Sequence, residues 1–549
     1  MENQVRQIDI RAQGAALDSA HVGDIRGAFG TIEVADTGKR SSWMARFKTL
    51  MAIIGPGLIV MVGDNDAGAF GTYTQAGQNY GTTLLWTLML LIPVLYVNQE
   101  MVLRLGVVSG VGHARLILER FGRFWGAFSV VDLFLVNALT IVTEFIGISL
   151  GLTFLGIPKI PGVIAAALLI MMAVSTGNFR RFERFSMVLV FASLLLVPVF
   201  VMVHPPLGQL AHDFLVPSYP QGAKLSDIML LVIGIVGTTV APWQLFFQQS
   251  YVIDKRITTR FIQYERWDLV LGIVLVIIGA VAMMAFAAHT FAGKPEFGNF
   301  ADAGAVASGI AKYFGKLPAQ LFAIALIDAC IIGASAVSLS TAYAVGDVLS
   351  TNHSLHRKPK EAIGFYAVYF TLIVIAAALV LIPGTPLGLL TNAVQTLAGV
   401  LLPSASVFLL LLCNDKEVLG PWVNGRKLNI FTAAIVAILV MLSIILTAAV
   451  IFPDISSEAI VGILVGGSLI ALVVTLAVKI IQAKRTQTLQ VVATRSPVQD
   501  RTLWRMPSLD QLKPMNLTLG TLVWMGVLRG YLIIAICMVA YKVVRMAFG

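Results

Sequence analysis

Two acidic residues lie in the middle of an apolar segment that is long enough to cross a membrane. Residues 51–70 read MAIIGPGLIVMVGDNDAGAF and contain Asp64 and Asp66. A charged side chain at the bilayer centre costs about 3 kcal/mol on insertion scales, so two acids within three residues indicate a polar partner inside the protein. Carboxylate oxygens are the ligands that hard divalent cations prefer. The pair therefore predicts a cation site within the membrane.

The residues around these acids favour a break in the helix. Gly63, Ala67, Gly68 and Gly71 include three glycines, which are poor residues for a helix interior. Unwinding would free backbone carbonyls, including that of Gly63, beside the carboxylates. Broken helices at the membrane midplane form ion sites of this kind in transporters.

Only one other apolar segment combines a helix breaker with small polar residues at mid-depth. Residues 230–250 read LLVIGIVGTTVAPWQLFFQQS. Pro242 has no amide proton and clashes with the preceding turn, so it frees carbonyls near Thr238 and Thr239. Hydroxyl and carbonyl oxygens there could complete an oxygen-only site with Asp66.

The composition indicates a membrane protein made of helices. The mean hydropathy is +0.85, and 57% of the 549 residues are hydrophobic while only 12% are charged. Stretches long enough to cross a hydrocarbon core of about 30 Å are helical in length, and a lipid-exposed backbone requires a helix or a closed barrel. A further stretch, 519–544, contains Arg529 and either spans the membrane or lies on its surface. The twelve predicted spans are 50–73, 82–103, 125–151, 160–176, 185–203, 227–251, 268–292, 317–349, 362–383, 387–413, 429–452 and 458–481.

The order of the spans predicts the fold. The first and sixth spans carry the two breaks and occupy corresponding positions in two halves of five spans. This arrangement is typical of the LeuT-type fold, an all-α polytopic membrane protein with a 5+5 inverted repeat and discontinuous helices 1 and 6. We therefore expect a cytoplasmic tail without stable structure at 1–49 and a ten-helix transport core at 50–413. Additional C-terminal helices follow at 414–549, with a cytoplasmic linker at 483–515.

The net charge of +10 is explained by the membrane rather than by a nucleic acid partner. Loops on the side of the N-terminus carry 31 of the Lys and Arg residues, and loops on the other side carry 5. By the positive-inside rule the N-terminus is cytoplasmic in a plasma or inner membrane. The three cysteines lie in apolar spans, no histidine cluster has metal-ligand spacing, and no catalytic motif is present. We therefore expect a protein of the lipid bilayer that is not an enzyme and has no resident cofactor.

Several segments together resemble the NRAMP family of divalent-metal transporters over roughly residues 50–450. The similar segments are GPGLIVMVGDNDAGAF in span 1, TLLW at Thr83–Trp86, RLGVVSG at Arg104–Gly110, GTTVAPWQLFFQQS in span 6 and NDKEVLGPWVN at Asn414–Asn424. The resemblance implies a LeuT-type secondary transporter in which the metal ion is the substrate.

The sequence departs from the family pattern at the positions that bind metal and move protons. Where the family has Asp-Pro-Gly-Asn, this chain has Asp66-Ala67-Gly68-Ala69, and where it has Met-Pro-His, this chain has Ala241-Pro242-Trp243. In span 3 the family's Asp and Glu become Ile141 and Glu144. The amide and thioether ligands and part of the proton route are lost. This pattern looks like the NRAMP-related magnesium transporters.

The resemblance and the chemistry together predict import of hydrated Mg²⁺, and also of Mn²⁺, by alternating access without proton coupling. Two alanines in place of Asn and Met widen the site and leave room for the water that Mg²⁺ retains. The alternatives are a proton-coupled transition-metal transporter of the ordinary NRAMP type and an organic-amine transporter of the same fold. The sequence leaves the oligomeric state open. The predicted site comprises Gly63, Asp64, Asp66, Ala69, Thr238, Thr239, Ala241, Trp243, Gln244 and Gln395, the two glutamines lying outside the direct ligands.

Four side chains keep two interpretations each. Asp64 either contacts the ion, directly or through water, or is structural. Glu144 is either functional or a protonated, hydrogen-bonded glutamate. Asp328 is either functional or a hydrogen-bonded structural acid, and Trp243 either shapes the cavity or only packs.

Overall fold

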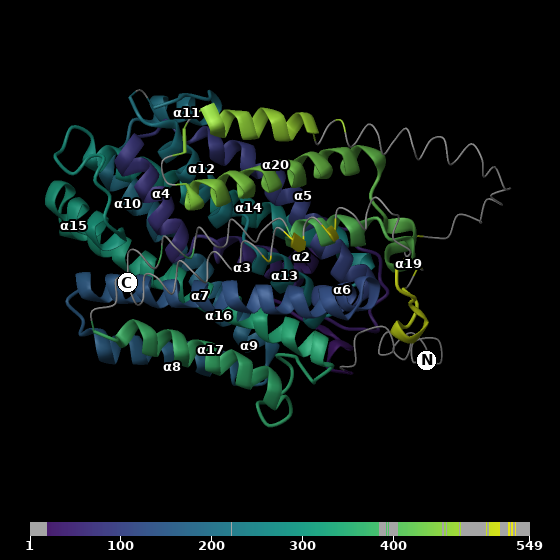
Figure 1. Ribbon diagram of the computed structural model, residues 1–549. Helices are drawn as coiled ribbons and strands as arrows, with labels where there is room; N and C mark the ends of the chain where they lie inside the picture. The colour runs from purple at the N-terminus through teal and green to yellow at the C-terminus, as the bar shows by residue number, and fades with distance from the viewer. Residues whose placement is uncertain are drawn as a thin grey trace.

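The computed structural model describes residues 19–383 apart from residue 221, together with 404–452, 458–470 and shorter runs up to residue 533. The long helices run side by side in a bundle, and α15 and α19 mark its opposite ends (Figure 1). In the described part, eight helices are long and apolar enough to cross a membrane, or nine if a bent pair counts as one. The long helices are α5 (Trp86–Ser109), α7 (Arg123–Phe154), α14 (Ile262–Phe291), α16 (Lys316–Leu349), α17 (Ile363–Leu381) and α20 (Arg426–Ile451).

The all-α prediction is confirmed, and the described helices follow the predicted spans. The shorter helices are α6 (His113–Phe121), α8 (Lys159–Val174), α9 (Phe179–Ala192), α10 (Leu196–Val203), α11 (Leu207–Leu215), α15 (Ala303–Phe314) and α19 (Lys416–Leu419). The predicted span 387–413 is described chiefly as a helix at Ser404–Cys413, and the predicted span 458–481 as a helix at Glu458–Ile470. Most of the linker 483–515 and of the stretch 519–544 lies outside the described residues.

Both predicted breaks are present. The first span consists of α3 (Pro56–Val62) and α4 (Ala67–Tyr80), separated by residues 63–66. The sixth consists of α12 (Leu225–Thr239) and α13 (Pro242–Asp254), separated by Val240 and Ala241. Pro242 is the first residue of α13, where a missing amide proton removes no helical hydrogen bond. The chemistry of Gly and Pro was thus sufficient to locate both breaks.

The short helix α3 is held at its N-terminus by a side chain from α14. Gly55 has no side chain to cap the helix, and Asp268 instead accepts a hydrogen bond from the backbone N–H of Gly57 at 2.6 Å. A carboxylate at a helix N-terminus satisfies free N–H groups and complements the helix dipole. The two helices touch closely here, since a Cβ on Gly57 would lie 2.5 Å from the backbone nitrogen of Leu269. The capping carboxylate therefore fixes α3 against α14.

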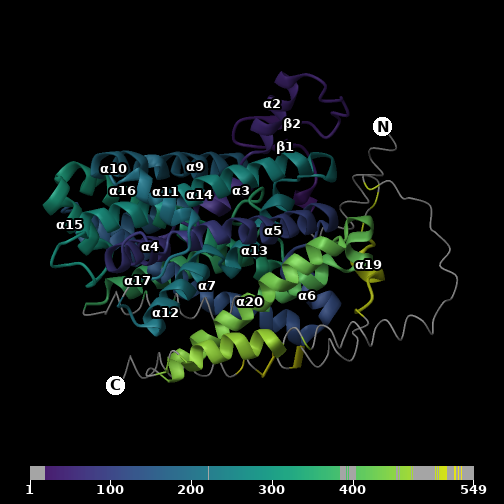
Figure 2. The ribbon, with the colours of Figure 1, turned by 90° about the horizontal axis from the view of Figure 1, so that it is seen from above.

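The N-terminal region from residue 19 is folded, so the prediction of an unstructured tail is wrong there. It contains a short hairpin, β1 (Ile25–Arg26) and β2 (Thr31–Ile32), and the helix α2 (Trp43–Ile53). Figure 2 shows these elements on one side of the bundle. The backbone N–H of Ala28 donates to Glu183 at 2.5 Å, and Arg184 donates to the carbonyl of Ala28 at 2.9 Å. Charged residues of α9 hold it in place together with Ile25 and Ile32, which are buried in an apolar cluster with residues of the bundle; residues 1–18 lie outside the described part.

The boundary predicted at residues 49 and 50 also falls inside a helix. α2 runs through it, and α2 and α3 meet at an angle of 52°. Trp43, Met44 and Phe47 of α2 are exposed, beside Arg46 and Lys48. Apolar and basic residues together on an exposed helix are typical of a helix that lies at the membrane interface.

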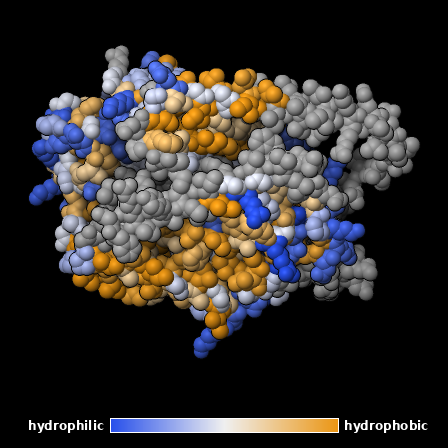
Figure 3. Space-filling view, in the orientation of Figure 1, coloured by the Kyte–Doolittle hydropathy of each residue, from blue (hydrophilic) through white to orange (hydrophobic). Residues whose placement is uncertain are grey.

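The outer surface carries an apolar belt. Figure 3 shows hydrophobic residues over the middle of the bundle and hydrophilic residues toward its two ends. Exposed side chains of α8 and α17, such as Leu168, Met172, Val374 and Ile375, contribute to this surface. Such a belt on helices of this length fits the lipid of a bilayer.

Candidate metal-binding site

Asp66 begins α4 and caps it. Its side chain accepts a hydrogen bond from the backbone N–H of Ala69 at 3.0 Å, and only 4% of the residue is exposed. Aspartate is a favoured N-cap residue because it satisfies a free N–H group of the first turn. The expectation of a polar partner inside the protein is thus confirmed for Asp66, and the methyl group of Ala69 leaves the position beside the carboxylate without a side-chain ligand.

Glu144 of α7 meets the same turn. Its Oε2 accepts from the backbone N–H of Ala67 at 3.2 Å, and its carboxyl group contacts that of Asp66. Two carboxylates in contact in a buried site cannot both stay ionised unless a proton or a cation lies between them. The pair is thus arranged either to share a proton or to face a positive ion.

Asp64 is held by an amide relay that comes from two other helices. Its Oδ1 accepts a hydrogen bond from Nε2 of Gln244, and Oε1 of Gln244 accepts from Nε2 of Gln99 at 3.0 Å. Because Gln99 donates, the Gln244 amide presents its NH₂ group to the carboxylate. The Oδ2 atom of Asp64 is buried and has no hydrogen-bond partner among the described residues.

The two threonines of span 6 have different surroundings. The Thr239 hydroxyl donates to the carbonyl of Ile235 at 2.5 Å and accepts from the Tyr73 hydroxyl at 2.6 Å. The Thr238 hydroxyl is buried and meets no hydrogen-bond partner within the described ranges. Of the two hydroxyls predicted near the ion, that of Thr238 is the one available to a ligand.

Trp243 fills the space beside the first break. Its ring tip lies 3.6 Å from the position that a Cβ on Gly63 would occupy, and 1% of the residue is exposed. Its carbonyl accepts from the Ser340 hydroxyl at 2.9 Å. The indole therefore packs directly against the unwound turn and limits its volume.

Contacts join most of the predicted site residues into two groups. Gly63, Asp64, Thr239, Trp243 and Gln244 form one, and Asp66, Ala69 and Glu144 form the other. Ala241 flanks the break in span 6 and is buried, while Gln395 lies outside the described residues. Among the described residues no three His, Cys, Asp or Glu side chains converge in a geometry that holds a metal ion. An ion at the breaks would need backbone oxygen and water in addition to the acids.

Sequence reasoning missed several buried polar residues. Gln99, which takes part in the amide relay to Asp64, belongs to a polar pair, Asn98-Gln99, within the apolar span 2. Two adjacent polar residues in an apolar span were the sequence feature that could have indicated the relay.

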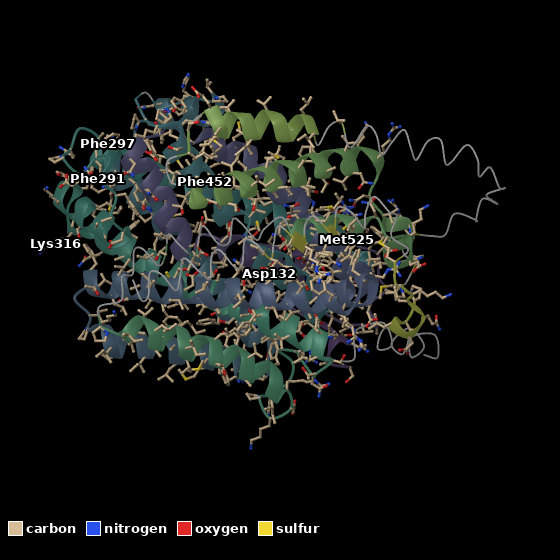
Figure 4. All side chains as sticks on the ribbon, viewed as in Figure 1. Asp132, Phe291, Phe297, Lys316, Phe452 and Met525 are labelled. Carbon is tan, nitrogen blue, oxygen red and sulfur yellow. The ribbon has the colours of Figure 1, made fainter. Side chains whose placement is uncertain are left out.

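Asp132 is a second residue that the sequence analysis did not single out. It lies on α7, where Figure 4 labels it, and it is buried and accepts a hydrogen bond from Ser404 at 3.1 Å. For Asp328, the structure leaves Oδ2 buried with no partner in the described part of the chain, so its hydrogen-bonded structural role stays a prediction.

A family model for natural resistance-associated macrophage protein-like proteins, Nramp, matches residues 57–449. The chain belongs to the Nramp family. The match covers both breaks and α7, so the resemblance inferred from the short segments is confirmed. The narrower resemblance to the magnesium branch is not tested by this match.

Relatives named as transporters share most of this Nramp chain's length. A protein of Ralstonia nicotianae named divalent metal cation transporter MntH is 29% identical over 396 residues, which cover 69% of this chain and 87% of the relative. A protein of Pectobacterium carotovorum with the same name is 27% identical over 409 residues, covering 73% and 94%. The structure of the Eremococcus coleocola manganese transporter with an aromatic bis-isothiourea compound matches with a TM-score of 0.62 at 20% identity, covering 84% of this chain and 98% of that one. This likeness confirms the fold.

Proposed function

We propose that this Nramp protein is a secondary transporter that imports divalent metal ions by alternating access, with Mg²⁺ as its principal substrate and Mn²⁺ as a second one. The observation that carries the proposal is the pair of opposed breaks. They bring a buried carboxylate, Asp66, and the buried hydroxyl of Thr238, which has no hydrogen-bond partner among the described residues, to the ends of two half-helices. Broken helices with acids and free oxygen atoms at mid-depth suit a cation.

The chemistry of the donors supports a hard ion. Ala69 and Ala241 stand at the positions where the family pattern has an amide and a thioether. Apart from the thiol of Cys330, which contacts Glu144, the remaining donors are carboxylate, hydroxyl and carbonyl oxygens, which suit Mg²⁺ and Mn²⁺, whereas sulfur ligands suit softer metals. Since few side chains can reach the ion, it keeps several of its waters, as Mg²⁺ commonly does.

We also propose that transport is not coupled to protons. Ile141 and Trp243 occupy positions where the family pattern has an acid and a histidine, and neither side chain can carry a proton. Coupling is dispensable energetically. A dication moving through 100 mV gains about 4.6 kcal/mol, at about 2.3 kcal/mol per charge, and this supports a gradient on the order of 10³.

A second candidate is proton-coupled Mn²⁺ transport of the ordinary Nramp type. One observation favours it: Glu144 is retained in contact with Asp66. Under this alternative Glu144 accepts a proton when the ion leaves Asp66.

Uptake into proteoliposomes that contain both a metal indicator and a pH indicator tests the two candidates. The proposal predicts Mg²⁺ and Mn²⁺ uptake driven by an inside-negative potential, with no acidification of the lumen. Acidification that depends on the metal would support the second candidate. Uptake of Cd²⁺ in preference to Mg²⁺ would contradict the hard-ion assignment, and uptake of no divalent cation would contradict both.

A further inference from the structure

The helix α2 has one face packed against the protein. Thr49, Ala52 and Ile53 on this face are buried. Ala52 and Ile53 belong to an apolar cluster that also contains Ile25 and Ile32 of the N-terminal hairpin. These contacts fix the rotation of α2 about its own axis, and so they determine which of its side chains point away from the protein.

The side chains on the opposite face of α2 are apolar and exposed. Trp43, Met44 and Phe47 are 73%, 52% and 43% exposed, and the rings of Trp43 and Phe47 stack with their centroids 5.5 Å apart. Successive residues of an α-helix are about 100° apart, which places these three in one stripe with the half-buried Leu50 and Met51. An exposed apolar stripe of this kind marks a surface that contacts a membrane or a protein partner.

Basic residues border this apolar stripe on both sides. Arg46 and Lys48 precede and follow Phe47, so they lie about 100° to either side of it, and both are exposed. The nearby Arg40 is different, because its guanidinium pairs with the carboxylate of Asp36 at 2.6 Å. An apolar stripe between two basic borders is typical of a helix in the plane of the membrane interface, where long basic side chains reach the lipid headgroups.

The depth of α2 in the bundle fits this interface. Trp267 of α14 is 62% exposed and begins a row of exposed side chains, Leu271, Val274 and Ile278, on one face of the helix. Tryptophan favours the boundary between lipid and water, so Trp267 marks that level. Its chain neighbour Asp268 caps α3, and α2 leaves α3 there at an angle of 52°. Figure 2 shows α2 projecting from the side of the bundle, as an in-plane helix would.

We propose that α2 docks on the cytoplasmic leaflet of the bilayer and binds anionic phospholipids. Trp43, Met44 and Phe47 enter the boundary of the acyl chains. Arg46 and Lys48 contact the anionic headgroups. The positive-inside rule assigns this end of the bundle to the cytoplasm, where the leaflet carries negative charge, and each Lys or Arg near such a surface favours association about fivefold. The docking helix precedes the family match at residues 57–449, and the inference does not depend on the proposed function.

A fluorophore on the apolar stripe tests the docking of α2. The full-length chain, with its three native cysteines replaced, carries an environment-sensitive fluorophore at Met44→Cys in vesicles of phosphatidylcholine and phosphatidylglycerol. The emission should be shifted to the blue and should be quenched by lipids brominated on their acyl chains. The same fluorophore at the exposed position Lys360→Cys serves as the control and should emit as in water. Water-like emission from Met44→Cys would overturn the proposal, and so would disulfide cross-linking of Met44→Cys between two chains, which would show that a second copy covers the stripe.

Energy transfer from this fluorophore tests the choice of lipid. Transfer to phosphatidylglycerol labelled on its acyl chain, compared with transfer to phosphatidylcholine bearing the same label, reports how far the anionic lipid is enriched around Met44→Cys. The double variant Arg46→Gln, Lys48→Gln should lower this enrichment at least threefold and leave the unfolding temperature unchanged. Lys358→Gln with Lys360→Gln removes the same charge from another exposed loop and should leave the enrichment as it is. No enrichment in the unsubstituted helix, or equal enrichment in the Arg46→Gln, Lys48→Gln variant, would overturn the binding of anionic lipid.

Discussion

Replacing Glu144 by glutamine separates the hydrogen bonds of this side chain from its charge. Its Oε2 accepts from the N–H of Ala67 at 3.2 Å, and its carboxyl group contacts Asp66. A glutamine can keep both contacts, because its oxygen can accept from Ala67 and its NH₂ group can donate to Asp66. Alanine removes both contacts and leaves the N–H of Ala67 without a partner at the first turn of α4. If Glu144 acts as a neutral donor, Glu144→Gln should behave nearly as wild type.

The size of the alanine effect follows from the lost contact with Asp66, the carboxylate that we propose binds the ion. A hydrogen bond to a charged group contributes about 1.5–3 kcal/mol, and about 1.4 kcal/mol corresponds to a tenfold change in affinity. Glu144→Ala should therefore weaken Mg²⁺ binding on the order of 10- to 100-fold. Glu144→Gln should stay within about threefold of wild type, since both contacts persist.

Isothermal titration calorimetry of the purified variants with Mg²⁺ measures these affinities. Uptake into proteoliposomes at pH 6, 7 and 8 shows whether the side chain must change its charge during the cycle. Wild type and Glu144→Gln should share one pH profile. Loss of uptake in Glu144→Gln as complete as in Glu144→Ala would refute the reasoning, because it would require an ionisable group and hence a role in proton movement.

Three further predictions follow from other parts of the chain. Gly27→Leu should lower the unfolding temperature by several degrees, because a Cβ at this position would lie 1.9 Å from the carbonyl oxygen of Ala52; an unchanged melting curve would contradict the docking of the N-terminal region. Burial lowers the pKa of His113 to about 4 although its bond to Gln249 opposes the shift, so its stabilisation of the folded chain is complete above pH 6.5 and falls by about 3 kcal/mol as the pH drops to 4. Unfolding temperatures of wild type and His113→Asn at pH 7 and pH 4.5 test this, and wild type should lose more stability than the variant. The double substitution Ala69→Asn and Ala241→Met should raise Cd²⁺ uptake relative to Mg²⁺ in proteoliposomes, since it supplies an amide and a soft thioether; an unchanged ratio would contradict the selectivity argument.

Local chemistry was sufficient to predict the breaks of the two discontinuous spans. Gly63 and its neighbours disfavour a helix wherever they occur, and Pro242 excludes the hydrogen bond of the preceding turn. The lengths of the apolar stretches likewise predicted the membrane-spanning helices, because the bilayer imposes a minimum length on each span. These features depend on a few consecutive residues, so they can be read from the sequence.

The contacts that hold the site depend on residues far apart in the chain. Gln244 donates to Asp64 across 180 positions, and Asp268 caps Gly57 across 211. Neither spacing is a pattern that a single sequence reveals. The bond of Asp66 to Ala69 differs, because the preference of aspartate for helix N-caps is a local signal for it.

The folded N-terminal region shows that amino-acid composition alone does not predict whether a segment is folded. No long apolar run precedes α2, and the segment is rich in Ala, Gly and charged residues, so an unstructured tail was the natural expectation. Two apolar residues of its hairpin, Ile25 and Ile32, are buried against the bundle, and its backbone is held by hydrogen bonds to Glu183, Arg180 and Arg184 of α9. Backbone groups offer such bonds whatever the side chains are, and composition therefore carries no sign of them.

The most direct test of a divalent-cation site at the broken helices compares Mg²⁺ uptake by wild type and Asp66→Asn in proteoliposomes with an inside-negative potential. Asparagine can keep the cap, because its side-chain oxygen can still accept from the N–H of Ala69, but it removes the charge. The variant should unfold within a few degrees of wild type and lose uptake by about 100-fold, the effect of roughly 3 kcal/mol at the ion. Wild-type uptake by Asp66→Asn would contradict the assignment of this carboxylate to the transported ion.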